Sequence, residues 1–528
     1  MKLPKELGTL ADLRAREKRA FDYSTHWSSH LEDIYEYFLP NRNLFEDTTR
    51  GAKKMDKIFD STAVEAIQQA ASKLQENIAP PYKRWATFQP SQVVINDLEA
   101  NDYGVTAQDI QENLDKQADI VFDYIHRSNF DTQFFEHALD LLVGTGTLRI
   151  DEVDDPEMPL VFNAIPQKGI AFEECPQGNL ETHWRRFKVK AKDLPRKWQG
   201  FQPSEKIKQL IEKKPDTMVD AFEGVIYLVS EKKYVGVLWI GKEDHISWYE
   251  DFGKSSPWVT GRYSKTAGEV RGRGPALQVL SDAKTINKIK EMQMQSAALS
   301  LAGMYTATDD GVTNPHTFTV SPGVVIPVGS NNSSNPSIRR LDTTADLQLP
   351  QFLFSDMAQN IKRCLFNDLR DPTAAVRSAT EVAIESRELA KRIGSAFGRL
   401  QTEVLIPIIK RVVYILTRRG ILQPLELDGR DIEIKFTSPL ARQQDAEDIL
   451  NVQQAMQFVL QNAGPDQSKI AFKLEELGAW VATKSGVPAE LVRSESDRAK
   501  IIQATAEMKM QGASVETEQP IQQGNTVL

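Results

Sequence analysis

The stretch from Arg377 to Leu416 reads "RSATEVAIESRELAKRIGSAFGRLQTEVLIPIIKRVVYIL" and predicts one long helix. Ser378 and Glu381 have the spacing of a capping box, in which each side chain accepts a hydrogen bond from a free backbone N–H. Apolar residues then recur in a stripe that runs along the whole stretch: Val382, Leu389, Ile393, Phe397, Leu400, Val404, Ile408 and Val412. Such a helix would be about 60 Å long. Pro407 lies inside it, so we expect a kink there.

The composition is that of an ordinary folded protein with more than one domain. The chain has 528 residues, of which 41% are hydrophobic and 26% charged. No apolar run reaches the length that a bilayer span requires, because Lys410 and Arg411 interrupt the longest one. Two cysteines, Cys175 and Cys364, are too few for a disulfide framework, so we expect the protein to be made in a reducing cytoplasm.

The charge balance excludes a protein that grips DNA over its whole surface. The chain has 73 acidic and 64 basic residues and a net charge of −9. Tight, sequence-independent DNA binding depends on basic side chains that neutralise phosphates. A protein of this charge could still lie beside DNA without holding it.

Along the chain, helical and strand patterns alternate in blocks. Amphipathic helices dominate the first 143 residues, and short alternating strands follow the "GTGT" segment at Gly144–Thr147. Pro275 opens a long helix that Gly303 ends, a turn-rich insert follows, and a second helix runs from Leu349 to Leu369. After the long helix come a strand near Ile434 and further helices. These blocks predict a mostly helical α+β protein.

No group of residues predicts a catalytic centre, a metal site or a cofactor site. "GTGT" has the glycines of a phosphate cradle but lacks the Lys-Ser/Thr pair of a Walker-type loop, so a tight turn is the better interpretation. Lys284 and Lys288 lie four residues apart on one helix face, and Arg370 and Arg377 bracket the loop before the long helix. In a monomer these residues would form a solvated charged face, whereas in a ring they would repeat as bands of positive charge.

Three quoted segments together resemble the portal proteins, the head-to-tail connectors of short-tailed double-stranded DNA phages. They are "FDSTAVEAIQQAASKLQENIAPPYKRWATF" from Phe59, "GRGPALQVLSDAKTINK" from Gly272 and "SATEVAIESRELAKRIGSAFGRLQTEVLIPIIKRV" from Ser378. The resemblance covers nearly the whole chain and is weakest after about Pro439. Its strength lies in the order and spacing of the segments.

The resemblance implies a dodecameric ring at one capsid vertex, with a central channel for double-stranded DNA during packaging and ejection. By analogy, the chain divides into seven parts: an N-terminal wing (1–274), stem helix 1 (275–303), a clip (304–348), stem helix 2 (349–369), a tunnel loop (370–377), the kinked helix with a return to the wing (378–440), and a C-terminal helical crown and tail (441–528). Pro407 would let the long helix bend from the channel wall into the wing.

The same resemblance implies partners and a location. Lys284, Lys288, Arg370 and Arg377 would touch DNA phosphates in the channel without reading bases. The partners would be further copies of the chain, the terminase large subunit, the tail adaptor, and the major capsid and scaffolding proteins, with no membrane. The protein would lie at the head-tail junction of the virion, after assembly in the host cytoplasm. It would not be an enzyme, because a separate terminase hydrolyses ATP.

Two other interpretations stay open at this point. A nucleotide-dependent or hydrolytic phage enzyme could use the "GTGT" segment, and a purified protein with turnover would favour it. A helical tail or ejection structural protein would fit the composition, but it leaves the helix–insert–helix segment without a purpose. Stable high-mass rings without ATPase activity would favour the portal.

Overall fold

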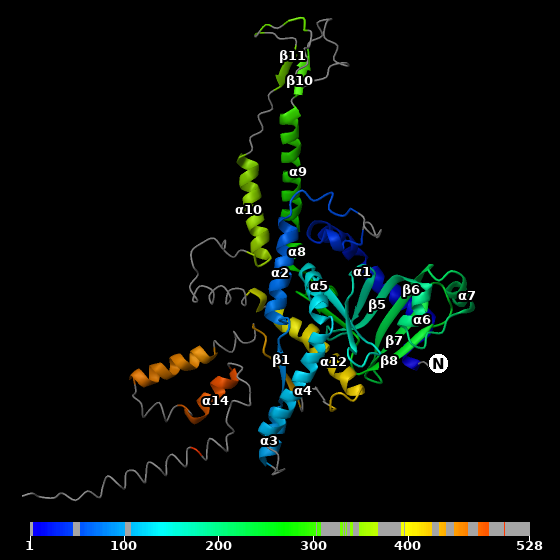
Figure 1. Ribbon diagram of the computed structural model, residues 1–528, viewed down its shortest axis with the longest axis vertical. Helices are drawn as coiled ribbons and strands as arrows, with labels where there is room; N and C mark the ends of the chain where they lie inside the picture. Colours follow the sequence, from blue (N-terminus) through cyan, green and yellow to red (C-terminus); the bar gives the residue numbers. More distant parts are fainter. Residues whose placement is uncertain are drawn as a thin grey trace, which may run out of the picture.

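The structure is a computed structural model. It describes residues 4–45, 53–100, 107–302, 304–307, 328–330, 332, 334, 338–341, 348–367, 392–394, 396–424, 432–439, 448–462, 472, 474–484 and 501. The predicted class is confirmed, because long helices and short antiparallel strands share the described part of the chain (Figure 1). Among these residues no helix is both long enough and apolar enough to cross a bilayer.

The main core lies where helices from the first third of the chain meet the long C-terminal helix. The N-terminal helices that contribute to it are α1 (Leu10–Phe38), α2 (Thr62–Ile78), α4 (Ala107–Arg127) and α5 (Phe130–Val143), and α3 (Gln92–Ala100) precedes α4 in the chain. Helix α1 begins with a capping box between Thr9 and Asp12. Side chains of α2, α4 and α5 pack with Ile408, Val412 and Leu416 in one buried cluster, so segments about 300 residues apart form a single core.

Two antiparallel sheets continue this core into a second layer. The smaller one has the order β3-β2-β9 and is formed by β2 (Thr145–Glu152), β3 (Leu160–Ala164) and β9 (Trp258–Arg262). The larger one has the order β4-β5-β6-β7-β8 and is formed by β4 (Ile170–Glu174), β5 (Leu180–Lys190), β6 (Met218–Leu228), β7 (Lys233–Ile240) and β8 (Trp248–Gly253). Each strand of the larger sheet pairs with its neighbour in the sequence, as in a meander.

Both faces of the five-stranded sheet are covered. One face packs against the N-terminal half of α1 through a cluster that includes Leu13, Trp184 and Trp239. The other face packs against α6 (Leu194–Lys197) and α7 (Glu205–Lys213), with Trp198 and Trp248 buried between them. Alternate side chains of a strand point to opposite faces, and here each set has its own hydrophobic cover.

A helical hairpin projects from this body. The chain enters it through α8 (Pro275–Gln278) and α9 (Leu280–Ala302) and returns through α10 (Gln348–Cys364). Strands β10 (Met304–Ala307) and β11 (Ile338–Leu341) pair antiparallel at its far end (Figure 1). The sequence predicted these helices at 275–303 and 349–369. The first is split at Val279, and the second ends five residues early, at Cys364.

The long helix predicted over 377–416 is described at residues 392–394, which are helical, and from Ala396 onward. Residues 396–400 are α-helical, Gln401–Leu405 form a π-helical turn, and α12 runs from Ile406 to Arg418. Strand β12 (Ile432–Phe436) then returns to pair antiparallel with β1 (Ala86–Pro90). Residues 448–462 and α14 (Leu474–Lys484) are helical in the C-terminal part.

Candidate functional site

The projecting hairpin has few packing contacts with the rest of the described chain. Its two helices contact one another through Lys290, whose Nζ lies 5.4 Å from the ring centroid of Phe354, and through Asn360, which donates to the Asp282 carboxylate. Helix α9 has 23 residues, a length of about 35 Å at the helical rise per residue. Only its first half reaches the body.

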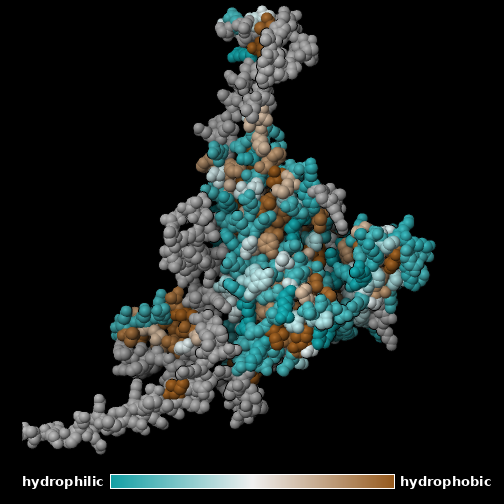
Figure 2. Space-filling view, in the orientation of Figure 1, coloured by the Kyte–Doolittle hydropathy of each residue, from teal (hydrophilic) through white to brown (hydrophobic). Residues whose placement is uncertain are grey.

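Large apolar side chains are exposed on both helices of the hairpin. Met292 on α9 is 58% exposed and Phe352 on α10 is 70% exposed, with Met294 and Leu353 beside them. Figure 2 shows hydrophobic residues along the projecting hairpin, above a body whose visible surface is mostly hydrophilic. Exposed apolar patches on soluble proteins mark interaction surfaces.

Asn287 fixes the base of the hairpin to the body. Its Oδ1 accepts hydrogen bonds from the backbone N–H of Phe59 at 2.7 Å and of Asp60 at 3.2 Å. Its Nδ2 donates to the carbonyl oxygen of Lys57 at 2.8 Å. The side chain is buried, and all three bonds go to backbone that leads into α2, so one asparagine sets the position of α9 against that segment.

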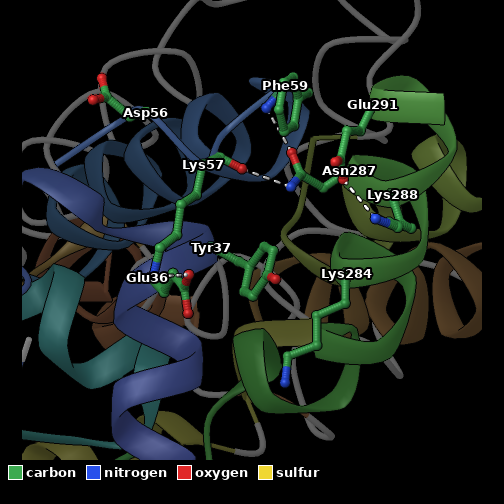
Figure 3. Close-up of a pocket in the computed structure, with 9 residues that line it drawn as sticks. All are labelled: Glu36, Tyr37, Asp56, Lys57, Phe59, Lys284, Asn287, Lys288 and Glu291. Atoms are coloured by element: carbon green, nitrogen blue, oxygen red, sulfur yellow. Dashed lines mark hydrogen bonds and ion pairs between the residues drawn. The ribbon is translucent and has the colours of Figure 1, made fainter. Parts of the chain in front are cut away.

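The predicted DNA contacts Lys284 and Lys288 lie beside Asn287 and line a pocket of about 400 Å³ between α1, the segment before α2, and α9 (Figure 3). Lys284 forms an ion pair with Asp33 at 2.7 Å, and its Nζ lies 5.7 Å from the ring of Tyr37. Lys288 pairs with Glu291 at 2.9 Å, and its side chain is 65% exposed.

The electrostatics of this pocket are balanced. Its lining includes three lysines (Lys57, Lys284, Lys288) and three carboxylates (Glu36, Asp56, Glu291). Lys57 also pairs with Glu36 at 3.2 Å. Burial, followed by the charge of Glu36, raises the pKa of Tyr37. A phosphate would therefore meet cations that already have acidic partners, so one copy of the chain offers no strong anion site here.

The other two predicted contacts, Arg370 and Arg377, lie outside the described residues, as does the whole predicted tunnel loop. Their role in contacting DNA stays a prediction.

Pro407 is the second residue after the π-helical turn. The N–H of Ile406 donates to the carbonyl oxygen of Gln401, a step of five residues instead of four. Proline has no N–H and its ring clashes with the preceding turn of an α-helix, so a wider turn just before it relieves both problems. The structure thus has an irregular helical turn at the place where the sequence predicts a kink, and the kink itself stays a prediction.

The π turn also aims Glu403 at the sheet. Its carboxylate accepts from the backbone N–H of Arg262 at 2.9 Å and from the guanidinium at 2.6 Å. Arg262 is 1% exposed and also pairs with Glu174 at 3.1 Å. Burial alone would lower the pKa of Arg262, but the hydrogen bonds and charge of Glu403 and then of Glu174 outweigh it and raise that pKa. These contacts join the π-helical turn to β9.

The "GTGT" segment is not the tight turn that the sequence predicted. Only Gly144 forms the connection after α5, with φ 153°, and Thr145 already begins strand β2. Thr145 and Thr147 are buried, and a Cβ on Gly144 would lie 2.3 Å from the carbonyl oxygen of Gly272. A nucleotide phosphate cannot reach this backbone, so the enzyme interpretation loses its candidate loop. Within the described residues no cluster of histidine, cysteine or acidic side chains could hold a metal ion.

Sequence reasoning missed Asn287, Arg262 and Glu403. Arg262 and Glu403 are 141 residues apart, and Asn287 bonds to backbone more than 220 residues away. No local pattern marks such pairs.

The α+β body has a buried core and carries a projecting hairpin with exposed apolar side chains. This combination is typical of a structural protein that acts by assembly. The model of the family described as "Bacteriophage head to tail connecting protein" matches residues 10–492. The chain belongs to this family, so the prediction of a head-to-tail connector is confirmed.

Curated relatives cover most of the chain. The "Probable portal protein" of Bordetella phage BPP-1 is 22% identical over 460 residues, which are 80% of this chain and 77% of that protein. The "Portal protein" of Enterobacteria phage T3 is 21% identical over 520 residues, which are 95% of this chain and 91% of that protein.

Among solved structures, a chain from the "Virion of native gene transfer agent (GTA) particle" matches with a TM-score of 0.34 at 13% identity, over 80% of this chain and 95% of that one. A chain from the "Neck of native GTA particle computed with C12 symmetry" matches with a TM-score of 0.30 at 13% identity, over 75% and 87%.

Proposed function

We propose that copies of this chain close into a ring, twelve in the head, at one vertex of a phage capsid. The ring is a portal: double-stranded DNA enters through its channel during packaging and leaves through it during ejection. Membership of the head-to-tail connector family supports this proposal, and so do the names of the two curated relatives.

The exposed apolar hairpin carries the proposal. The contact between Lys290 and Phe354 puts Met292 and Met294 of α9 near the height of Phe352 and Leu353 of α10. A ring is built from a repeated contact between two different faces of the same chain. Met292 and Met294 are two residues apart and lie on different faces of α9. A contact between α9 of one copy and α10 of the next would therefore bury one of these methionines, with its sulfur against the Phe352 ring.

In such a ring the paired helices α9 and α10 form the stem around the channel, and the β10–β11 end forms the clip. Of the two described lysines, Lys288 is the better candidate for a transient contact with DNA, because it is the more exposed. A net charge of −9 per copy keeps most of the surface repulsive to phosphate, so DNA can slide instead of sticking.

The ring has no catalytic role of its own and offers surfaces to other proteins. The terminase large subunit supplies ATP hydrolysis and docks at the clip during packaging. The tail adaptor takes the same end afterwards, while the wing faces the scaffolding and major capsid proteins. The protein assembles in the host cytoplasm and stays in the virion at the head-tail junction.

The test is the mass of the purified particle. We expect the wild-type chain to form closed rings at about 10 μM, seen as annular class averages and as a single high-mass species in mass photometry. Replacing Phe352 by Ser removes one apolar anchor and should reduce the ring fraction by about tenfold, because a buried aromatic contact at an interface contributes about 1–3 kcal/mol.

Val229→Ser is the matched control. Val229 is 66% exposed, close to the 70% of Phe352, but it lies in the body, directly after strand β6. This variant should assemble like the wild type. A wild-type chain that stays monomeric at this concentration, or equal loss of rings in both variants, would contradict the proposal.

A further inference from the structure

Helix α10 ends in a Schellman motif, a turn in which two backbone N–H groups return to the last carbonyl groups of a helix. The N–H of Phe366 donates to Arg363 at 3.2 Å, and the N–H of Asn367 donates to Lys362 at 2.6 Å. Phe366 supplies the left-handed residue of this motif, with φ 59°. The turn makes the chain leave the hairpin at Asn367.

Phenylalanine is an unusual residue at this position. Glycine usually occupies it, because a Cβ is strained in the left-handed region. The Phe366 side chain is buried in the main core beside Ile361 and Leu365. Core packing therefore requires a large side chain, and the strained backbone has to be held by other contacts.

Helix α2 supplies those contacts. Lys73 donates through its ammonium group to the carbonyl oxygen of Phe366 and, at 2.9 Å, to Oδ1 of Asn367. Asn367 in turn donates through Nδ2 to the carbonyl oxygen of Ala66 at 2.6 Å. The C-terminal end of a helix carries partial negative charge, so a lysine ammonium beside the turn that follows α10 is favourable.

We propose that Lys73 is a positioning residue that caps α10 from α2 and so fixes where the stem ends. Without the ammonium group, Phe366 can relax into the right-handed region and the helix can continue past Asn367. The wing and the stem exit are then no longer coupled. The effect of this cap on DNA retention rests on the proposed portal function, because the predicted tunnel loop at 370–377 follows directly.

Hydrogen exchange of the full-length protein tests the cap. In Lys73→Met, which keeps the side-chain length and the helix propensity of α2, we expect the amides of Phe366 and Asn367 to exchange about tenfold faster. Lys73→Arg keeps the cation and should stay within twofold of the wild type. Lys206→Met changes an exposed lysine of α7 and is the matched control, with no change expected.

Asn367→Ala gives an independent variant. It removes one acceptor of Lys73 and the bond to Ala66 but leaves the Phe366 carbonyl in place, so the expected acceleration is smaller, about threefold at Phe366. Unchanged exchange at Phe366 in both Lys73→Met and Asn367→Ala would overturn the proposal. If Lys73→Met does not fold, unchanged exchange in Asn367→Ala alone overturns it.

A second measurement separates this inference from the proposed function. Phage particles assembled with Lys73→Met should still contain rings but should lose packaged DNA at least several-fold faster than particles with Lys206→Met. Faster exchange together with unchanged retention would remove only the role in retention. Unchanged exchange in Lys73→Met would contradict the cap. A wild-type chain that never forms rings would contradict the portal function. The two outcomes are independent of each other.

Discussion

The sheet body and the projecting hairpin use their side chains in opposite ways. In the body, even charged groups are buried with partners: Arg149 pairs with Glu223 and Asp151, and Arg262 pairs with Glu403 and Glu174. In the hairpin, Met292 and Phe352 are exposed although they are apolar. The buried ion pairs of the body form within one chain, whereas the exposed apolar side chains of the hairpin mark a surface that another molecule covers.

This difference has an energetic reason. Trp184 and Trp239 are fully buried on one face of the five-stranded sheet, and burial of large side chains stabilises that part by about 1.5–3 kcal/mol each. Helix α9 beyond its contacts at Asn287 has one partner helix and little core. Isolated helices are marginal in water, so most helix stability comes from packing. Substitutions in the body should thus change unfolding, and substitutions in the hairpin should change assembly.

The largest effect is expected at Arg262. Arg262→Met leaves Glu403 and Glu174 facing a side chain without charge, and breaking a buried pair by removal of one partner destabilises by about 3–5 kcal/mol. Urea unfolding followed by tryptophan fluorescence measures this loss as a lower midpoint.

Arg273→Met is the control for that substitution. Arg273 pairs with Glu269, four residues earlier in the chain, at 2.6 Å, but its side chain is 45% exposed. An exposed pair contributes about 0–1 kcal/mol. Equal losses in the two variants would mean that the lock between β9 and the π turn adds nothing to the stability of the body.

A second, smaller effect depends on pH and belongs to the body alone. Burial lowers the pKa of His183 to about 3, from an ordinary 6.5. Between these two values the unfolded chain binds a proton that the folded chain does not, so stability present above pH 6.5 is lost as the pH falls. For one such histidine the loss between pH 7 and pH 5 is about 2 kcal/mol.

In the wild type, Nε2 of His183 lies 3.0 Å from Oγ1 of Thr260. His183→Gln removes the titrating group but keeps a polar side chain that can reach this hydroxyl. We expect the wild type to lose about 2 kcal/mol more than the variant between pH 7 and pH 5, from urea midpoints at both pH values. Identical slopes for wild type and His183→Gln would show that His183 is protonated in the fold.

The smallest effect is expected in the hairpin. Lys288→Gln breaks an exposed pair with Glu291 and should change the free energy of unfolding by less than about 0.5 kcal/mol. In assembled particles it should lower the salt dependence of DNA movement through the channel, measured as the ejection rate at two ionic strengths. A large loss of stability in Lys288→Gln would contradict the expectation that substitutions in the hairpin change assembly and leave unfolding almost unchanged.

Local patterns predicted the fold class and most elements. The strands around Ile150, Phe187, Ile226 and Val237 alternate or are β-branched, and each is present. The sequence did not predict β4 and β9. All five residues of β9 are buried, so this strand lacks the alternation by which a strand is recognised. Strand β1 follows a helix and a Pro-Pro turn, and it exists because β12 pairs with it from about 350 residues away.

The candidate site was less accessible to sequence reasoning. Spacing put Lys284 and Lys288 on one helix face, with Glu291 three residues from Lys288. It could not show that Lys284 pairs with Asp33 of α1. The end of α10 was predicted at Leu369 from the continuing pattern. The structure ends it at Cys364, because a lysine on another helix and a buried phenylalanine stabilise a left-handed turn.

The sequence by itself determined what depends on neighbours along the chain: the helical periods, the place of Pro407, the turn-rich insert and the acidic balance. Tertiary structure decided what depends on distant partners: the Arg262–Glu403 lock, the Asn287 and Lys73 contacts, and the exposure of Met292 and Phe352. The physical reason is range. Periodicity and backbone propensity act within a few residues, whereas burial and charge pairing join atoms that only the folded chain brings together.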